Sequence, residues 1–261
     1  AVIHTAAKVA MWGDYNQFYN VNFLGTQNVI KAMKKGSVSK LIFTSSPSVI
    51  FGDQDKMGDD ETLPYPPKHF AMYPKTKAMA EKLALESNDS KDFLTCSLRP
   101  HLIFGPGDEN LIPRLAQKAK SGKLKIIGDG ENKVDVHYVE NSALAHVLAL
   151  EKLQADSPLC GQSYFLGQDE PVKLWSFINT ILKQKGLSPI TKKIPYRAAK
   201  LMALSAQALM KLFRYKGEDP ILTYFVVMQL AKNHYFDHSK SLRDLGNYNL
   251  ITTEDGLKNL S

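Results

Sequence analysis

A chain of 261 residues can bury a substantial core, either as one large domain or as two smaller ones. Its hydrophobic content of 44% and charged content of 23% are ordinary for a globular protein. No uninterrupted apolar run reaches the roughly 18–20 residues of a membrane-spanning helix, and the first residues lack the pattern of a secretory signal. Two cysteines without metal-ligand spacing exclude a disulfide framework, so we expect a cytoplasmic location.

The net charge of +7 is spread along the chain rather than gathered in one patch. Its short basic clusters lack the interleaved aromatic residues of a groove for single-stranded nucleic acid, and we expect no nucleic-acid partner. Solvated helix faces explain most of this charge. The alternative is attraction to a carboxylate or phosphate substrate, or to an acidic lipid surface.

The first half of the chain alternates short buried strands with long helices. Strands are predicted at residues 2–4, 40–44 and 93–98, helices at 15–35 and 73–87, and a polar loop at 52–70. The first helix places Phe18, Val21, Leu24, Asn28 and Ala32 on one stripe, and Gly36 ends it in the C′ position. This alternation predicts right-handed βαβ units, and therefore an α/β fold with a doubly wound parallel sheet.

The second half is less regular and predicts a smaller lobe built on the sheet. Helices are expected at 112–120, 141–153 and 174–185, and short strands at 125–127 and 163–166. Residues 197–231 read as two apolar helices separated by Gly217 and Pro220.

Tyr73 and Lys77 are the pair of residues with the clearest chemistry. They lie four apart in a predicted helix whose first turn tolerates Pro74, so their side chains share one face. A phenol with a pKa of about 10 is a poor acid–base catalyst near neutrality, whereas a neighbouring ammonium lowers that pKa. The pair can therefore give a proton to a carbonyl or take one from an alcohol.

Two serines follow the predicted strand at 40–44, at the edge where open α/β sheets bind ligands. A hydroxyl there can hold a reacting oxygen against the tyrosine. We assign this role to Ser46 and expect Ser45 only to terminate the strand.

Several segments, in this order along the chain, resemble the extended short-chain dehydrogenases, and among these the 3β-hydroxysteroid dehydrogenase branch. The segments are Asn20–Val29, Thr44–Val49, Tyr73-x-x-x-Lys77, Arg99–Gly107, Asp135–Asn141 and Tyr235–Asp237. Within the branch, Ala6-Ala7-Lys8, Trp12-Gly13 and Gly128–Asp135 are similar to bacterial reductases of 2-alkyl-3-oxoalkanoates in olefin biosynthesis. The resemblance covers nearly the whole chain.

The resemblance implies an NAD(P)-dependent enzyme in which Tyr73 transfers the proton, Lys77 binds the nicotinamide ribose and Ser46 orients the substrate oxygen. Asn22 lies where the family keeps an asparagine in its proton relay, although a buried structural amide is the alternative. The cofactor would also contact the backbone of His4, Thr5 and Ala6, and the side chains of Pro100 and Ile103. A homodimer built from the helices at 15–35 and 73–87 is implied as well, and Ala78, Ala80, Leu83 and Ala84 could face either the partner or the sheet.

The sequence departs from the family pattern at one point, because it has no glycine-rich turn for the cofactor pyrophosphate. From the family pattern we expect roughly 60–80 further residues, about two βαβ units, to precede the position of Ala1. Residues 1–106 and 139–167 would then form the remainder of a Rossmann-type nucleotide-binding domain, and 107–138 with 168–261 the substrate lobe. We expect NADP(H) rather than NAD(H).

The substrate is expected to be hydrophobic. One face of residues 197–213 carries Leu201, Leu204, Ala208, Leu209 and Leu212, with Lys200, Lys211 and Arg214 around it. These leucines are most simply core positions of the substrate lobe. Together with the apolar residues 221–228, this segment could wall a pocket or touch a membrane surface. A long-chain 2-alkyl-3-oxo acid, reduced to the 3-hydroxy acid, fits both features.

Other functions remain open at this point. A 3β-hydroxysteroid or sterol dehydrogenase suits the same apolar walls. A nucleotide-sugar epimerase or dehydratase would share Tyr73 and Lys77, and a non-catalytic NAD(P) sensor or a partner-binding scaffold would share the fold. His234 and His238 have the i, i+4 spacing of helical zinc ligands, but without a third ligand we expect no metal.

Overall fold

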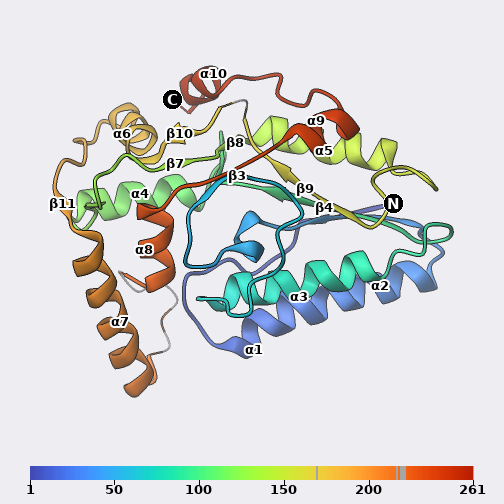
Figure 1. Cartoon of the computed structure of the whole chain (residues 1–261), viewed down its shortest axis with the longest axis horizontal. Coiled ribbons are helices and arrows are strands. Elements are labelled where there is room, and N and C mark those ends of the chain that lie inside the picture. Colours follow the sequence, from blue (N-terminus) through green and yellow to red (C-terminus); the bar gives the residue numbers. More distant parts are fainter. Residues whose placement is uncertain (169, 216, 218–221, 261) are drawn as a thin grey trace.

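The computed structural model describes residues 1–168, 170–215, 217 and 222–260. These residues build a four-stranded sheet in the order β1-β2-β4-β9, in which all neighbours are parallel. The strands are β1 (Val2–His4), β2 (Lys40–Thr44), β4 (Leu94–Pro100) and β9 (Gln162–Leu166). The predicted doubly wound α/β fold is confirmed, and Figure 1 shows helices on both sides of this sheet.

Both faces of the sheet are buried. In β2, Leu41 and Phe43 pack on one side against α2 (Gly25–Lys35) and α3 (Met72–Glu86). Ile42 between them packs on the other side against α5 (Val139–Lys152). Successive side chains of a strand point to opposite faces, so a strand covered on both faces is apolar throughout. This explains the continuous apolar run Leu41–Phe43 in β2, whereas β4 also buries Thr95, Ser97 and Arg99.

The predicted helix at 15–35 forms, but as α1 (Tyr15–Phe18), a π-helical stretch over Tyr19–Leu24 and α2. Its predicted apolar stripe is wrong: Val21 and Asn28 are exposed, and the buried positions include Asn22, Thr26 and Ile30. Polar residues can occupy this face because hydrogen bonds to other segments satisfy them. The left-handed residue after the helix is Ser37 (φ 54°), and Gly36 is the C-cap with a negative φ.

Helix α3 buries its small residues inside the chain. Ala78, Ala80 and Ala84 are almost inaccessible, because they pack against the sheet and the segment that follows β2. They therefore face the body of the protein rather than a partner, which decides the alternative that the sequence left open. The homodimer stays a prediction that rests on the exposed side of α1 to α3.

The segment predicted as a loop at 52–70 contains a short strand, β3 (Lys56–Asp59), that lies in a second sheet. This sheet has the order β10-β7-β12-β3 and joins β3 to strands more than 70 residues away. The partner strands are β7 (Lys133–Val134), β10 (Val172–Lys173) and β12 (His234–Phe236). Pairing between distant segments gives no periodic signal in so short a strand, so the sequence missed it.

The remaining predicted elements of the second half form within one to three residues of their predicted bounds. They are α4 (Leu111–Lys120), β6 (Ile126–Ile127), α5, β9 and α6 (Leu174–Gln184). Small pairs and helices complete this half: β5 (Ile103–Phe104) with β8 (His137–Tyr138), β11 (Lys193–Ile194) with β6, α9 (Ser239–Leu245) and α10 (Thr253–Lys258). The proposed division into a nucleotide-binding part and a substrate lobe remains a prediction.

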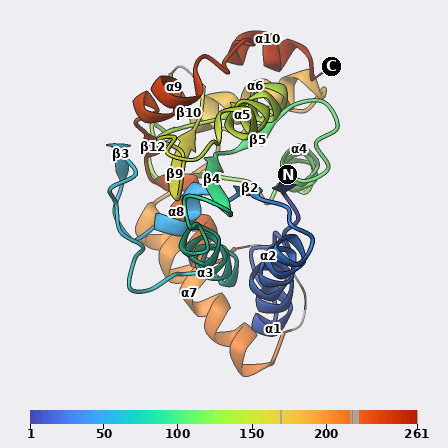
Figure 2. The same cartoon turned by 90° about the vertical axis from the view of Figure 1, so that its right-hand side faces the viewer.

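Residues 197–231 give the two predicted apolar helices, α7 (Tyr196–Leu212) and α8 (Tyr224–Ala231). The break predicted at Pro220 and the first residue of 221–228 lie outside the described residues. Figures 1 and 2 both show α7 extending away from the body of the molecule. In the part of the chain that the structure describes, no helix combines the length and the hydropathy needed to cross a bilayer.

Candidate active site

A cavity of about 640 Å³ lies where β1, β2 and β4 end. Ligands of open α/β sheets bind at this carboxyl edge. Six of the predicted site residues line the cavity: Thr5, Ser46, Tyr73, Lys77, Pro100 and Ile103. His4, Ala6 and Asn22 are not among its lining residues, although their neighbours Thr5 and Ala7 are. The fold therefore gathers predicted site residues from four segments of the chain in one place.

Tyr73 lies in the first turn of α3 and faces Ser46. The Tyr73 phenol and the Ser46 hydroxyl form a hydrogen bond. Burial raises the pKa of Tyr73, and this hydrogen bond opposes the shift. The phenol is therefore protonated near neutrality, as a proton donor to a ketone must be.

Ser48 is a polar residue of the site that sequence reasoning missed. Ser46 begins a 3₁₀ turn over Pro47–Ile50, and its Oγ accepts a hydrogen bond from the Ser48 backbone N–H. The hydroxyls of Ser46 and Ser48 are 2.9 Å apart, and both residues line the cavity. The turn therefore fixes two hydroxyls rather than one beside the tyrosine.

Lys77 is only 2% exposed, although it carries an ammonium group. Its Nζ donates to the Thr44 carbonyl at 2.6 Å and lies 4.1 Å from the centre of the Phe43 ring. Burial lowers the pKa of Lys77 to about 8, while the charge of Glu81 raises it. An ammonium has three donors, and the Thr44 bond uses one of them. The position thus suits a group that also binds hydroxyls of a ligand.

Glu81, which sequence reasoning also missed, lies at the centre of a buried polar network behind Lys77. Arg99 donates to both carboxylate oxygens, with its Nη2 2.6 Å from Glu81 Oε1. Ser97 and Tyr65 donate to the same carboxylate at 2.9 and 2.7 Å. Burial would raise the pKa of Glu81, but Arg99, together with hydrogen bonds from Ser45 and Tyr65, outweighs burial and lowers the pKa. The spacing Tyr73, Lys77, Glu81 on one helix face was the available signal.

Asn22 connects two walls of the site. Its Oδ1 accepts from the Lys8 backbone N–H at 2.7 Å, and its Nδ2 donates to the Lys8 carbonyl and to the Thr76 hydroxyl. Asn22 therefore holds the segment after β1 against α3. This geometry is that of the structural amide that we named as the alternative, and a role in a proton relay stays a prediction.

His4 points away from the cavity and bonds to the helix beside it. The Thr26 hydroxyl donates to the Asn22 carbonyl at 2.7 Å, so it must accept from His4 Nε2, 3.1 Å away. Burial and the charge of Lys77 lower the pKa of His4, so the ring is neutral. Any contact of this residue with a cofactor would therefore come from its backbone.

His101 and His234 form a buried pair in the cavity wall. His234 Nε2 donates to the Gln229 carbonyl at 2.8 Å, so its Nδ1 accepts from His101 Nε2, 2.6 Å away. Burial lowers the pKa of both rings, and that of His101 falls well below its usual value. Since His101 and Gln229 both line the cavity, the pair fixes α8 against the end of β4. His234 is therefore a strand residue, and not one of two zinc ligands on a helix.

The rest of the cavity is mostly apolar. Helices α4, α6 and α8 contribute Leu115, Leu174, Phe177, Ile178, Phe225, Val226 and Leu230. The α4 wall also carries two cationic residues, Arg114 and Lys118, one helical turn apart. The predicted positive rim thus lies on α4 and not on α7. The leucines of α7 are absent from the lining residues.

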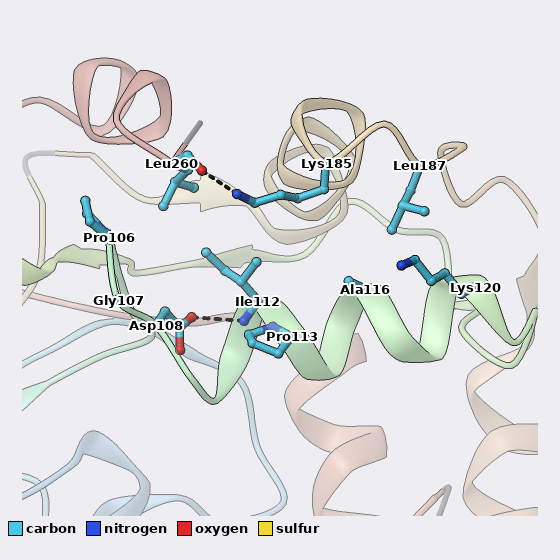
Figure 3. Close-up of a pocket in the computed structure, with 11 residues that line it drawn as sticks. Pro106, Gly107, Asp108, Ile112, Pro113, Ala116, Lys120, Lys185, Leu187 and Leu260 are labelled. Atoms are coloured by element: carbon cyan, nitrogen blue, oxygen red, sulfur yellow. Dashed lines mark hydrogen bonds between the residues drawn. The ribbon is translucent and has the colours of Figure 1, made fainter.

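A second pocket of about 410 Å³ lies on the other side of the loop Gly105–Asp108. Figure 3 shows its wall of Ile112, Pro113, Ala116 and Leu187, with Lys185 donating to the Leu260 carbonyl. None of the predicted site residues lines it. Among the described residues there is also no group of three His, Cys, Asp or Glu side chains that could hold a metal ion. The larger cavity is therefore the candidate active site.

Comparisons with known proteins agree with this arrangement. Residues 1–196 match the 3-beta hydroxysteroid dehydrogenase/isomerase family. The 2-alkyl-3-oxoalkanoate reductase of Shewanella oneidensis is 40% identical over 99% of the chain and 68% of its own length. That of Stenotrophomonas maltophilia is 38% identical over 100% of the chain and 79% of its own length. The decarboxylating sterol-4-alpha-carboxylate 3-dehydrogenase of Mus musculus is 36% identical, with 98% and 72% covered.

Solved structures show the same fold at lower identity. Gox2253 matches with a TM-score of 0.75 and 24% identity, over 98% of this chain and 76% of that one. MoeE5, solved with UDP-glucuronic acid and NAD, matches with a TM-score of 0.70 and 20% identity, over 99% and 76%. The chain belongs to the 3-beta hydroxysteroid dehydrogenase/isomerase family and is an NAD(P)-dependent oxidoreductase that acts on hydroxyl and keto groups.

Proposed function

We propose that this protein reduces the ketone of a hydrophobic 3-oxo acid, with Tyr73 as the proton donor. The observation that carries the proposal is that Ser46, Tyr73 and Lys77 lie together in the wall of a mostly apolar cavity. The reaction needs a donor beside the ketone oxygen and an apolar space for the rest of the substrate. This one cavity supplies both, because Tyr73 is part of its wall and its other walls are mostly apolar.

The cavity fits the reactive end of a nicotinamide cofactor, which supplies the hydride when it is bound. Thr5, Pro100 and Ile103 would surround the nicotinamide, and Lys77 would bind the ribose through the donors that the Thr44 bond leaves. Ser46 would donate a hydrogen bond to the ketone oxygen. Tyr73 would give that oxygen its proton, because burial keeps the phenol protonated.

The acid group of the substrate is supported by charge. Arg114 and Lys118 bring two positive groups to the α4 wall, in addition to Lys77. Asp108 and Glu109 also line the cavity, so its three cationic residues outnumber its two carboxylates and leave the lining net positive, which favours a negatively charged substrate. The substrates named for two relatives agree with this, because a 2-alkyl-3-oxoalkanoate and a sterol-4-carboxylate both carry a carboxyl group on the carbon adjacent to C3.

A series of substrates tests the proposal. We expect kcat/KM to rise with chain length on 2-alkyl-3-oxo acids, by up to roughly fourfold for each buried methylene. A sterol-4-carboxylate is the second candidate, which the mouse relative favours. A flat response to chain length together with a clear preference for the sterol would replace the first candidate by the second. A UDP-sugar is the third comparison, and turnover of it alone would overturn both.

The contribution of charge is tested separately. Arg114→Gln with Lys118→Gln should raise KM for the acid and leave KM for its methyl ester nearly unchanged. An equal effect on both compounds would show that these residues do not recognise the carboxylate. The preference for NADP(H) over NAD(H) stays a prediction, and the ratio of the two kcat/KM values decides it.

A further inference from the structure

Helix α7 differs from an ordinary surface helix because it is apolar on its exposed side as well as on its buried side. Ala199 and Ala203 are fully buried and form its inner side, against α8. The opposite side carries Leu201, Leu204, Ala208 and Leu212, at the i, i+3 and i+4 spacing of one helix face. Leu201 is 68% exposed and Leu212 is 73% exposed. The expectation that these leucines belong to the core is therefore wrong.

The exposed apolar surface continues around the end of the helix. Met202, Leu209, Phe213 and Tyr215 are each about half exposed or more. Single exposed apolar residues are normal, but a contiguous group of this kind marks an interaction site. We define this group, together with Leu201, Leu204 and Leu212, as the α7 surface.

The charged residues of α7 itself and of the turn that follows it have one sign, although Asp53 from another segment lies beside Lys200. Residues 195–215 contain Arg197, Lys200, Lys211 and Arg214 and no aspartate or glutamate. Lys200 is 3.9 Å from Asp53, and Arg197 and Lys211 lie along the same edge of the helix as Leu204. Leucine and phenylalanine flanked by basic residues are the pattern of a helix that lies in the headgroup region of a bilayer.

We propose that α7 docks this protein on an anionic lipid surface, with its axis parallel to the membrane. Its 17 residues would extend about 26 Å along that surface, since an α-helix rises 1.5 Å per residue. A second copy of the chain is a poorer occupant, because a two-fold contact between identical surfaces would bring basic edges together. A lipid surface with negative headgroups matches both the apolar face and its charge.

The inner side of α7, opposite the α7 surface, lies next to one wall of the active-site cavity. Helix α7 packs against α8, which lines the cavity with Phe225 and Val226. At the C-terminal end of α7, Trp12 Nε1 donates to the Tyr215 carbonyl at 3.5 Å. Trp12 is close in sequence to Val9 and Met11, which line the cavity. The docking itself does not depend on the substrate that we propose.

Flotation of the protein with lipid vesicles tests the proposal. The probes are vesicles of phosphatidylcholine alone and vesicles that also contain phosphatidylglycerol. We expect binding to the anionic vesicles that weakens with added salt, and much less binding to phosphatidylcholine. The double variant Leu201→Glu, Leu212→Glu should bind the anionic vesicles at least roughly tenfold more weakly, because each change places a carboxylate in the apolar face.

A matched control uses exposed apolar residues elsewhere. Met57→Glu with Leu250→Glu adds the same charge at positions that are 61% and 67% exposed, and should bind like the wild type. Thermal unfolding and activity on a short, water-soluble 3-oxo acid should be equal for all three proteins. The proposal is overturned if the wild type ignores anionic vesicles, or if both double variants lose binding equally. It is also overturned if the α7 variant only abolishes self-association, measured by sedimentation without vesicles.

Discussion

Helices α3 and α7 both break the usual rule for a surface helix, in opposite ways. The buried side of α3 carries polar residues beside its alanines, with Thr76, Lys77 and Glu81 almost inaccessible to solvent. The exposed side of α7 is apolar, with Leu201 and Leu212 facing outward. A surface helix normally hides its apolar stripe and exposes its charges. Natural proteins depart from such rules mainly at functional sites, which suggests a function for each helix.

The two helices differ in whether their unusual side chains have partners within the chain. In α3 the buried groups have partners in the same chain, because Arg99, Ser97 and Tyr65 surround Glu81 and the Thr44 carbonyl accepts from Lys77. The outward leucines of α7 remain exposed in the described chain. An internal network of this kind indicates a rigid site, even though Arg99 Nη1 has no hydrogen-bond partner among the described residues, whereas an uncovered apolar face indicates a partner outside the chain. The following predictions test this contrast.

The largest effect is expected at the reacting end of α3. Tyr73→Phe should lower kcat by roughly 10²–10⁴, the range that general acid–base catalysis usually supplies. Cofactor affinity should change little, because the hydroxyl serves the transition state. Steady-state kinetics together with a fluorescence titration of NADPH would measure both quantities. Retention of more than about a tenth of wild-type kcat would contradict the role of Tyr73.

Breaking the network behind Lys77 should lower the stability of the folded protein and not only its activity. Glu81→Gln leaves the Arg99 charge buried without its carboxylate, and we expect the free energy of unfolding to fall by about 3–5 kcal/mol. Urea denaturation followed by circular dichroism would measure it. The matched control is Glu86→Gln in the same helix, because Glu86 is exposed and pairs with Lys82 across 3.7 Å. Similar losses in both variants would disprove the special role of the network.

The low pKa of Lys77 predicts a pH dependence. Lys77 is cationic below its pKa of about 8 and neutral above it. If the cationic form is the active one, kcat/KM should fall as the pH rises through about 8, since kcat/KM reports the free enzyme. Lys77→Arg should remove this fall, because a guanidinium keeps its proton. The pH profiles of the two proteins decide, and an unchanged profile in the variant would assign the fall to another group.

The smallest effects are expected on α7, where the two sides should respond differently. Ala203→Leu adds bulk to the packed inner side and should destabilise the protein by about 1–3 kcal/mol. Leu209→Gln changes the exposed side and should stay within about 0.5 kcal/mol. Thermal unfolding of both variants measures the difference. A loss for Leu209→Gln as large as that for Ala203→Leu would mean that the outer face is covered within the protein itself.

The sequence by itself predicted the alternation of strands and helices, the parallel sheet and the Tyr73–Lys77 pair. These features depend on local periodicity and on residues a few positions apart, so they are visible along the chain. The sequence also predicted Ser46, because the end of a strand fixes the edge of the sheet to which a side chain belongs.

Only the tertiary structure decided which faces are buried and which distant residues meet. The partners of Glu81, the pair His101–His234 and the strand β3 all join segments far apart in the sequence, which leaves no periodic signal. Local pattern also could not predict which side of α7 is buried, because leucines at helical spacing look the same whether they pack on a core or face outward. The choice depends on what lies against the helix, and here Ala199 and Ala203 take the inner side because α8 approaches closely there.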